Sequence, residues 1–203
     1  VALSKLVPPC ASPIDLGRTH AHTGRAVQPG IDRDPKQLAS YSLRVSTANS
    51  TGWGPLKEYL QTCSDDVILA QEHHLTADLI AAATQWALRH GWQPTWGAAD
   101  PCDGTSGTSG GVAVFVREGI GTRHGHHVIE PTARICAAIV TVPGGCDTLM
   151  CSTYLQSGAG LNDLNIDVLH SMGVSLTTWN KAFIVGGGFN MEPQALETSG
   201  VAA

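Results

Sequence analysis

Four apolar segments of the chain each end in a polar side chain that can take part in chemistry, namely Asn49, Glu72, Tyr154 and Asn190. Glu72 is the only carboxylate among the four. A hard ion such as Mg²⁺ prefers oxygen ligands and is commonly held by one or two carboxylates plus substrate phosphate. If the four ends meet in one crevice, Glu72 can bind such an ion and Asn49 can add an amide oxygen or orient the carboxylate. Tyr154 and Asn190 can then stabilise charge on phosphorus.

The fourth segment, FIVGGGFNMEP, reads as a buried strand that breaks into three glycines before Asn190. Glycines let the backbone pass close to another group, and open α/β proteins bind ligands at the carboxyl ends of their strands. A plain strand-to-turn exit is the alternative, with Asn190 merely holding the turn. Tyr154 can likewise be an ordinary strand-end residue, and Glu72 a loop carboxylate beside two solvated histidines.

The composition sets limits on the class of protein. With 203 residues and a net charge of -5, the chain can form one domain with a sizeable core, and it is unsuited to coating nucleic-acid phosphates with cations. The six cysteines include no C-x-x-C pair, so we expect reduced thiols and an intracellular (nuclear or cytoplasmic) protein. No signal-peptide pattern or membrane-spanning apolar run occurs.

The elements expected to position these residues begin near residue 42. Residues 1–41 are rich in proline and lack a sustained period, so we interpret them as a poorly ordered leader or linker, and residues 42–203 as the domain. Alternating or continuous apolar runs predict strands at 43–47, 67–70, 92–96, 112–116, 135–142, 148–153 and 183–185, with 135–142 and 148–153 forming an antiparallel hairpin. Helical spacing predicts a short helix after Pro55, a helix after Thr76 that buries Leu79, Ala83, Trp86 and Ala87, and one that buries Leu161, Leu164, Val168, Met172, Leu176 and Trp179. Together the elements indicate an α/β to α+β class with mixed sheets.

The order of these motifs resembles the endonuclease/exonuclease/phosphatase superfamily, which includes exonuclease III-like nucleases and retroelement endonucleases. The resemblance rests on Ile68 to Glu72, Ser109 to Val114 and Val185 to Asn190, and covers about residues 42–195. It implies a four-layer αββα sandwich and Mg²⁺-dependent cleavage of phosphoesters, with Mn²⁺ as the alternative ion. It also implies that Glu72 and Asn49 form the metal site, that Tyr154 contacts the phosphate, and that Asn190 stabilises the transition state. The partner would then be nucleic acid or another phosphoester.

Two departures from the family pattern concern catalysis. The family has an aspartate before Phe-Asn, which orients or deprotonates the attacking water, and this chain has Gly188 there. The family also ends with a Ser-Asp-His motif on its last strands, and no such motif occurs here. We therefore expect a domain that lacks the last strands, has an open strand edge, and is inactive or severely impaired as written. The alternative is a non-catalytic phosphate- or metal-binding or scaffold module, such as a degenerate retroelement endonuclease.

Two further patterns carry less weight. Gly107 to Gly111 matches G-x-S-x-G, but a nucleophile elbow needs a strand before it and a helix after it, and the sequence predicts a loop and then a strand. The histidines 20, 22, 124, 126 and 127 can bind a transition metal, but no partner fixes a geometry, so we favour exposed polar turns.

Overall fold

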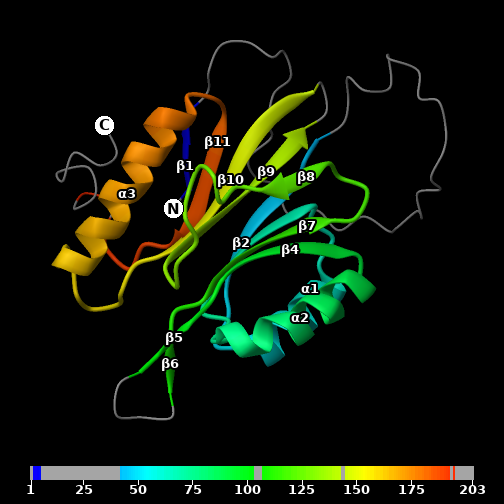
Figure 1. Ribbon diagram of the computed structural model, residues 1–203, viewed down its shortest axis with the longest axis horizontal. Helices are drawn as coiled ribbons and strands as arrows, with labels where there is room; N and C mark the ends of the chain where they lie inside the picture. Colours follow the sequence, from blue (N-terminus) through cyan, green and yellow to red (C-terminus); the bar gives the residue numbers. More distant parts are fainter. Residues whose placement is uncertain (1, 6–41, 103–106, 143–144, 193, 195–203) are drawn as a thin grey trace.

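The computed structural model describes residues 2–5, 42–102, 107–142, 145–192 and 194. Its described part holds two principal sheets and three helices, which are arranged in four layers (Figure 1). Helices α1 (Trp53–Thr62) and α2 (Ala77–Arg89) cover the outer face of one sheet, and α3 (Asp163–Trp179) covers the outer face of the other. This arrangement confirms the predicted αββα sandwich.

The four-stranded sheet positions two of the predicted site residues, Asn49 and Glu72. Its order is β2 (Val45–Asn49), β3 (Val67–Gln71), β7 (Val112–Arg117) and β4 (Trp92–Gly97). Strands β2 and β3 are parallel, with Asn49 opposite Gln71, so the residues that follow both strands leave the sheet at the same end. All five residues of β3 are buried, as the continuous apolar run predicts for a strand covered on both faces.

The five-stranded sheet positions the other two predicted site residues, Tyr154 and Asn190. Its order is β1 (Ala2–Lys5), β11 (Phe183–Gly188), β10 (Cys146–Tyr154), β9 (Ile135–Val142) and β8 (Thr122–His124). Strands β9 and β10 form the predicted antiparallel pair, whereas β10 and β11 are parallel and place Tyr154 opposite Gly188. A short pair, β5 (Asp100–Pro101) and β6 (Thr108–Ser109), lies in the segment expected to be a loop.

Three apolar clusters hold the layers together, and side-chain alternation along β3 shows how. Val67 and Leu69 point into the cluster between the sheets, while Ile68 and Ala70 point into the cluster beneath α1 and α2. The third cluster fills the space between the five-stranded sheet and α3. Because strand side chains alternate between the two faces, one apolar strand serves two layers at once.

Several sequence expectations need correction. Leu79, Leu161 and Leu164 are exposed by 49%, 38% and 43%, although helical spacing predicted that they were buried. In α2 the close contact with the sheet is made by the small residues Ala83 and Ala87. In α3 a buried position is taken by Asn165, whose side chain binds the backbone of residues 156 and 160, so a polar anchor replaces an apolar contact.

The N-terminal residues and the cysteines also differ from expectation. Residues 2–5, expected in the leader, form β1, which pairs antiparallel with β11 and is an edge strand of the five-stranded sheet. Residues 6–41, including His20 and His22, lie outside the described residues. Cys63, Cys102, Cys136 and Cys151 are free thiols, but Cys146 is disulfide-bonded, contrary to the expectation of reduced cysteines throughout. No helix among the described ranges combines the length and apolarity needed to cross a bilayer.

Candidate active site

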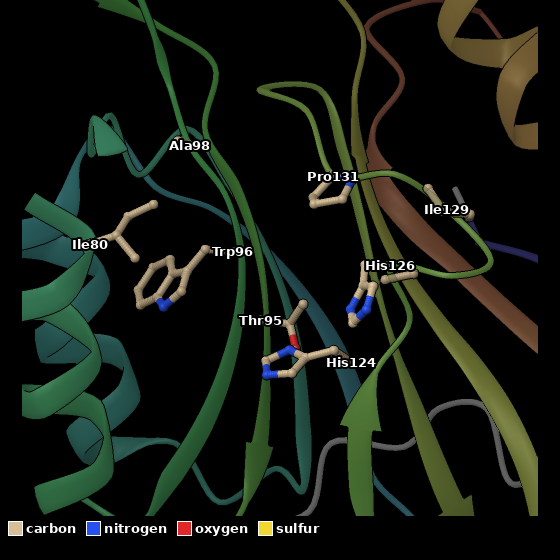
Figure 2. Close-up of a pocket in the computed structure, with 9 residues that line it drawn as sticks. Ile80, Thr95, Trp96, Ala98, His124, His126, Ile129 and Pro131 are labelled. Atoms are coloured by element: carbon tan, nitrogen blue, oxygen red, sulfur yellow. The ribbon is translucent and has the colours of Figure 1, made fainter. Parts of the chain in front are cut away.

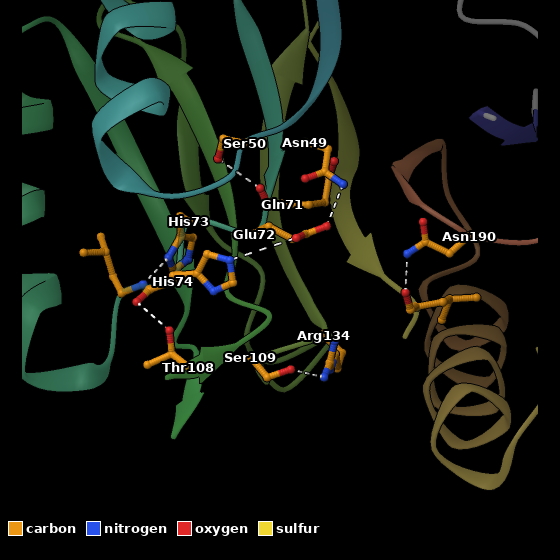
Figure 3. Close-up of polar contacts among 12 residues, drawn as sticks. Asn49, Ser50, Gln71, Glu72, His73, His74, Thr108, Ser109, Arg134 and Asn190 are labelled. Carbon is orange, nitrogen blue, oxygen red and sulfur yellow. Dashed lines mark hydrogen bonds and ion pairs between the residues drawn. The ribbon is translucent and has the colours of Figure 1, made fainter. Parts of the chain in front are cut away.

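Asn49, Glu72 and Asn190 lie at one end of the sandwich, where β2, β3 and β11 end (Figure 3). Strand β10 ends there too, with Tyr154 opposite Gly188. Asn49 Nδ2 donates a hydrogen bond to Glu72 Oε1 at 2.7 Å. Glu72 and Asn190 both lie near enough to the Tyr154 hydroxyl to affect its pKa, which Glu72 raises and Asn190 lowers. Side chains from strands separated by more than a hundred residues therefore form one polar cluster, and we call this end of the sandwich the crevice.

Glu72 is held at the centre of this crevice. Its backbone has φ 58°, in the left-handed region that residues other than glycine rarely adopt. The bond from Asn49 fixes one carboxylate oxygen, and the other lies 4.0 Å from His74 Nε2. The side chain keeps 23% exposure, so a ligand can reach it from solvent. Asn49 thus orients the carboxylate through its amide nitrogen, which is the second of the two roles considered for it.

Tyr154 and Asn190 form the opposite wall. Tyr154 is buried, and burial followed by the nearby Glu72 charge raises the pKa of its phenol, so the hydroxyl keeps its proton at neutral pH. Asn190 has φ 51° and donates from Nδ2 to the carbonyl oxygen of Leu155 at 2.6 Å. That bond holds the turn after β11, so Asn190 has the structural role as well as a place in the crevice.

The three glycines of β11 have different surroundings. A Cβ on Gly187 would lie 1.9 Å from the carbonyl oxygen of Thr153, which no side chain could tolerate. A Cβ on Gly188 would make one tight contact, with the Tyr154 ring at 3.1 Å, and one ordinary contact, with Asn190 Nδ2 at 3.7 Å. Gly187 is therefore required for the close parallel pairing of β10 and β11, whereas position 188 could carry a side chain directed at the crevice.

Arg134 is a site residue that the sequence reasoning missed. It is only 8% exposed, its guanidinium lies 5.1 Å from the centre of the Tyr154 ring, and its Nη2 donates to Ser109 Oγ at 2.7 Å. No carboxylate of the described residues forms an ion pair with it. The only signal in the sequence is a lone arginine before an apolar strand, which has no spacing to set it apart.

A buried polar contact joins the two sheets directly below the crevice. Gln71 Nε2 donates to Ser152 Oγ at 2.9 Å, and Ser152 Oγ donates to the carbonyl oxygen of Ala70 at 2.7 Å. Gln71 and Ser152 are both almost fully buried. Because buried polar groups need partners, this contact fixes β3 against β10 and so fixes Glu72 relative to Tyr154.

The two histidines after Glu72 differ from the solvated pair that was the alternative. His73 is fully buried: its Nδ1 accepts from the Leu75 amide at 3.0 Å, and its Nε2 lies 3.2 Å from the carbonyl oxygen of Val112. This pattern requires the neutral ring with the proton on Nε2. Burial lowers the pKa of His73 to about 4. His74 is partly exposed, and its buried Nδ1 has no hydrogen-bond partner among the described residues.

Solved structures with a similar arrangement were found, and most of this chain aligns with each of them. An AP endonuclease from Leishmania major aligns with 79% of this chain at 20% identity and a TM-score of 0.51, over 60% of its own length. D. rerio TDP2, solved in complex with a single-stranded DNA product, aligns with 78% at 14% identity and a TM-score of 0.52, over 64% of its length. An endonuclease/exonuclease/phosphatase protein from Beutenbergia cavernae aligns with 75% at 18% identity and a TM-score of 0.50, over 49% of its length.

The chain has the endonuclease/exonuclease/phosphatase fold. No protein-family model matches the sequence, and no curated protein matches it either. The chain spans about half to two thirds of the length of these three structures. The likeness shows the fold, while the roles of Asn49, Glu72, Tyr154 and Asn190 depend on the geometry described above.

The side chains at the crevice of this endonuclease/exonuclease/phosphatase fold are compatible with a divalent cation that has a single protein ligand. Among the described residues no group of three or more His, Cys, Asp or Glu side chains could hold a metal ion. Of the four predicted site residues only Glu72 offers a carboxylate, and Mg²⁺ bound by a single carboxylate completes its shell with water and substrate phosphate. Glu72 would therefore be the protein ligand, with Asn49 holding it in place.

A separate pocket of about 420 Å³ lies between β4 and the loop that follows β8 (Figure 2). Thr95, Trp96, His124 and His126 line it, and His124 Nδ1 lies 3.1 Å from Thr95 Oγ1. His126 and His127 are exposed, as expected for a polar turn. None of the four predicted site residues lines this pocket, so this hollow and the candidate active site are different places.

Proposed function

We propose that this chain is a Mg²⁺-dependent phosphodiester-hydrolase domain of the nuclease-like type, with turnover absent or severely impaired as written. The observation that carries the proposal is the convergence of Asn49, Glu72 and Tyr154 from three strands at one end of the sandwich. A divalent ion on Glu72 would polarise a phosphoryl oxygen and stabilise the leaving oxygen. Mn²⁺ would serve in the same place.

Each side chain would have a defined part in handling the phosphoryl group. Asn49 would keep the Glu72 carboxylate turned toward the ion. The protonated hydroxyl of Tyr154 would donate to a phosphoryl oxygen, and Arg134 would neutralise charge on it. Asn190 would act on the same oxygens if its bond to Leu155 exchanged on ligand binding.

The predicted impairment comes from position 188. Glycine has no group that can accept a proton from the attacking water, and general-base assistance is worth ~10²–10⁴ in rate. This feature favours the second candidate function, a phosphate- or metal-binding or scaffold module that keeps the fold without the chemistry, as in a degenerate retroelement endonuclease.

Metal binding and turnover separate the two functions. The loss of the free Mn²⁺ signal in electron paramagnetic resonance should report one ion per chain, displaced by Mg²⁺. Glu72→Gln should weaken binding by about tenfold or more, because it removes the only carboxylate ligand. Glu118→Gln, an exposed carboxylate at the other end of the sandwich, is the matched control and should bind as the unaltered chain does.

Turnover is measured with Mg²⁺ on plasmid and abasic-site DNA. Robust turnover by the unaltered chain that EDTA abolishes would show that the account of Gly188 is wrong. Binding without turnover supports the non-catalytic module. Mn²⁺ binding that Glu72→Gln leaves unchanged would remove the basis of both functions.

A further inference from the structure

The described cationic side chains are distributed unevenly over the molecule. The Arg44 and Arg117 side chains donate to Ser64 and to backbone carbonyls of residues 63 and 65, just before β3. Arg123 and Lys181 pair with Asp147 at the start of β10. All of these lie at the end of the sheets opposite the crevice. Arg89 is in the last turn of α2, and Lys57 lies on α1 in the outer layer. Within the described residues, only Arg134 places a lysine or arginine charge at the crevice.

Arg134 lacks a counter-charge within the described residues. A guanidinium has five N–H donors, and one hydrogen bond to Ser109 together with the Tyr154 ring leaves most of its capacity for a ligand. Buried charges in proteins are normally paired, because removing them from water is costly. A guanidinium held in this way at the mouth of a crevice is suited to an anion with two or more oxygens.

In the described part of the chain, the crevice offers little positive charge beyond Arg134. Glu72 adds a carboxylate to the same cluster, since Glu72 and Arg134 both act on Tyr154. A duplex offers one negative charge per ~1.7 Å of its axis, and proteins that bind it neutralise several phosphates with lysine and arginine. One arginine beside one carboxylate can compensate one phosphoryl group but not a run of neighbouring phosphates.

We propose that the crevice selects a single terminal phosphoryl group, on a small molecule or at the end of a nucleic-acid chain, over a run of backbone phosphates. The inference rests on the proposed function and narrows its ligand class. Arg134 and Ser109 bind this group, and Tyr154 donates to it beside the ion on Glu72. With one arginine at this end among the described residues, contacts to a long run of backbone phosphates have no cations to support them.

The test compares three fluorescent probes in Mg²⁺ by anisotropy: thymidine 5′-monophosphate, a 5′-phosphorylated single strand of about 20 nucleotides, and a duplex of about the same length without terminal phosphate. The first two should bind with Kd values within about threefold of each other, and the duplex at least about tenfold more weakly. The slope of log K against log salt for the single strand should be about −0.7, the value for one phosphate. Binding of the mononucleotide alone would assign the site to small phosphoesters, and equal binding of both would show that chain ends are accepted.

Variants tie the result to Arg134. Arg134→Met should weaken the mononucleotide by about tenfold and bring the slope near zero, while Arg134→Lys should retain the slope. Arg89→Met removes a distant exposed cation and should change neither value. Because Arg134 is buried, thermal melting checks that each variant folds, and the slope of the unaltered chain is decisive on its own.

A slope of about −3 or steeper, or a duplex bound more tightly than the mononucleotide, would overturn this inference and leave the proposed function standing. If no probe binds while Mn²⁺ still binds at Glu72, the site holds an ion but no phosphoryl group. That result would refute both the phosphoester substrate of the proposed function and the preference for a terminal phosphoryl group.

Discussion

An aspartate at position 188 should restore part of the missing chemistry. Gly188 does not have a left-handed φ, so a side chain there meets no backbone strain. A new Cβ would lie 3.1 Å from Tyr154 Cδ2 and 3.7 Å from Asn190 Nδ2, so the tyrosine ring must move by a few tenths of an ångström. The carboxylate would then lie between the two residues that form the second wall of the crevice.

The expected magnitude follows from general-base catalysis. A carboxylate that accepts a proton from the attacking water is worth ~10²–10⁴ in rate, or about 3–5 kcal/mol of activation free energy. Gly188→Asp should therefore raise Mg²⁺-dependent hydrolysis of bis(p-nitrophenyl) phosphate by about this factor. Filling the site adds one tight contact and relieves the entropy penalty of a strand glycine, ~0.5–1 kcal/mol, so the melting temperature should change little.

The matched control is Gly188→Asn, which has the same size as the aspartate but cannot accept a proton. It should show the turnover of the unaltered chain. The gain in Gly188→Asp should disappear at pH values below the pKa of the new carboxylate, and Glu72→Gln should abolish it. Equal rates for the Asp and Asn variants would refute the reasoning, because filling space rather than accepting a proton would then be the cause.

Two other predictions concern stability. The pKa of His73 is about 4 in the folded chain, against an ordinary value of 6.5 when the ring is in water. Between these pH values the unfolded state binds more protons than the folded state. The free energy of unfolding is therefore highest above pH 6.5 and falls as the pH falls toward 4. Urea unfolding should show a loss of about 2 kcal/mol between pH 7.5 and pH 5 that His73→Gln removes, and a flat profile for the unaltered chain would contradict the burial argument. Gly187→Ala should destabilise the fold by about 3 kcal/mol or more, because its Cβ would overlap the Thr153 carbonyl oxygen. Gly173→Ala, within α3 and with open space around it, should cost nothing or stabilise slightly, and similar melting temperatures for the two variants would count against the tight strand pairing.

The sequence predicts the strands better than the helix faces, and the reason is physical. A strand such as β3 is a short continuous apolar run between polar ends, so its limits are visible without knowledge of its neighbours. A helix face depends on where the helix lies over the sheet. Leu79 and Leu164 have the correct spacing for burial but are exposed, while Asn165 is buried because it anchors a loop.

The same distinction applies to the candidate site. Asn49, Glu72 and Tyr154 were found because each ends an apolar strand, and the structure brings them together. Their chemical roles stay a prediction. Arg134 could not be found in this way, since its significance comes from burial without an ion partner, which depends on contacts with Ser109 and Tyr154 that are distant in sequence.

Strand β1 could not be predicted for a related reason. A segment of four residues is too short to show a period, and its partner β11 lies almost the whole length of the chain away. Pairing at a sheet edge depends on the partner's exposed backbone groups rather than on a local pattern. An expectation based on local composition alone therefore placed residues 2–5 in a leader.

The hydrogen bonds that Ser152 makes with Gln71 and Ala70 have a consequence for the kinetics of ligand capture. They join the two sheets just below the Glu72 carboxylate and the Tyr154 phenol, so the spacing between these two groups is fixed before an anion binds. An incoming phosphoryl group should meet a rigid receptor, and its association rate should be independent of any opening motion. Ser152→Ala would leave the Gln71 amide without its partner on the other sheet, and the distance between Glu72 and Tyr154 would then fluctuate.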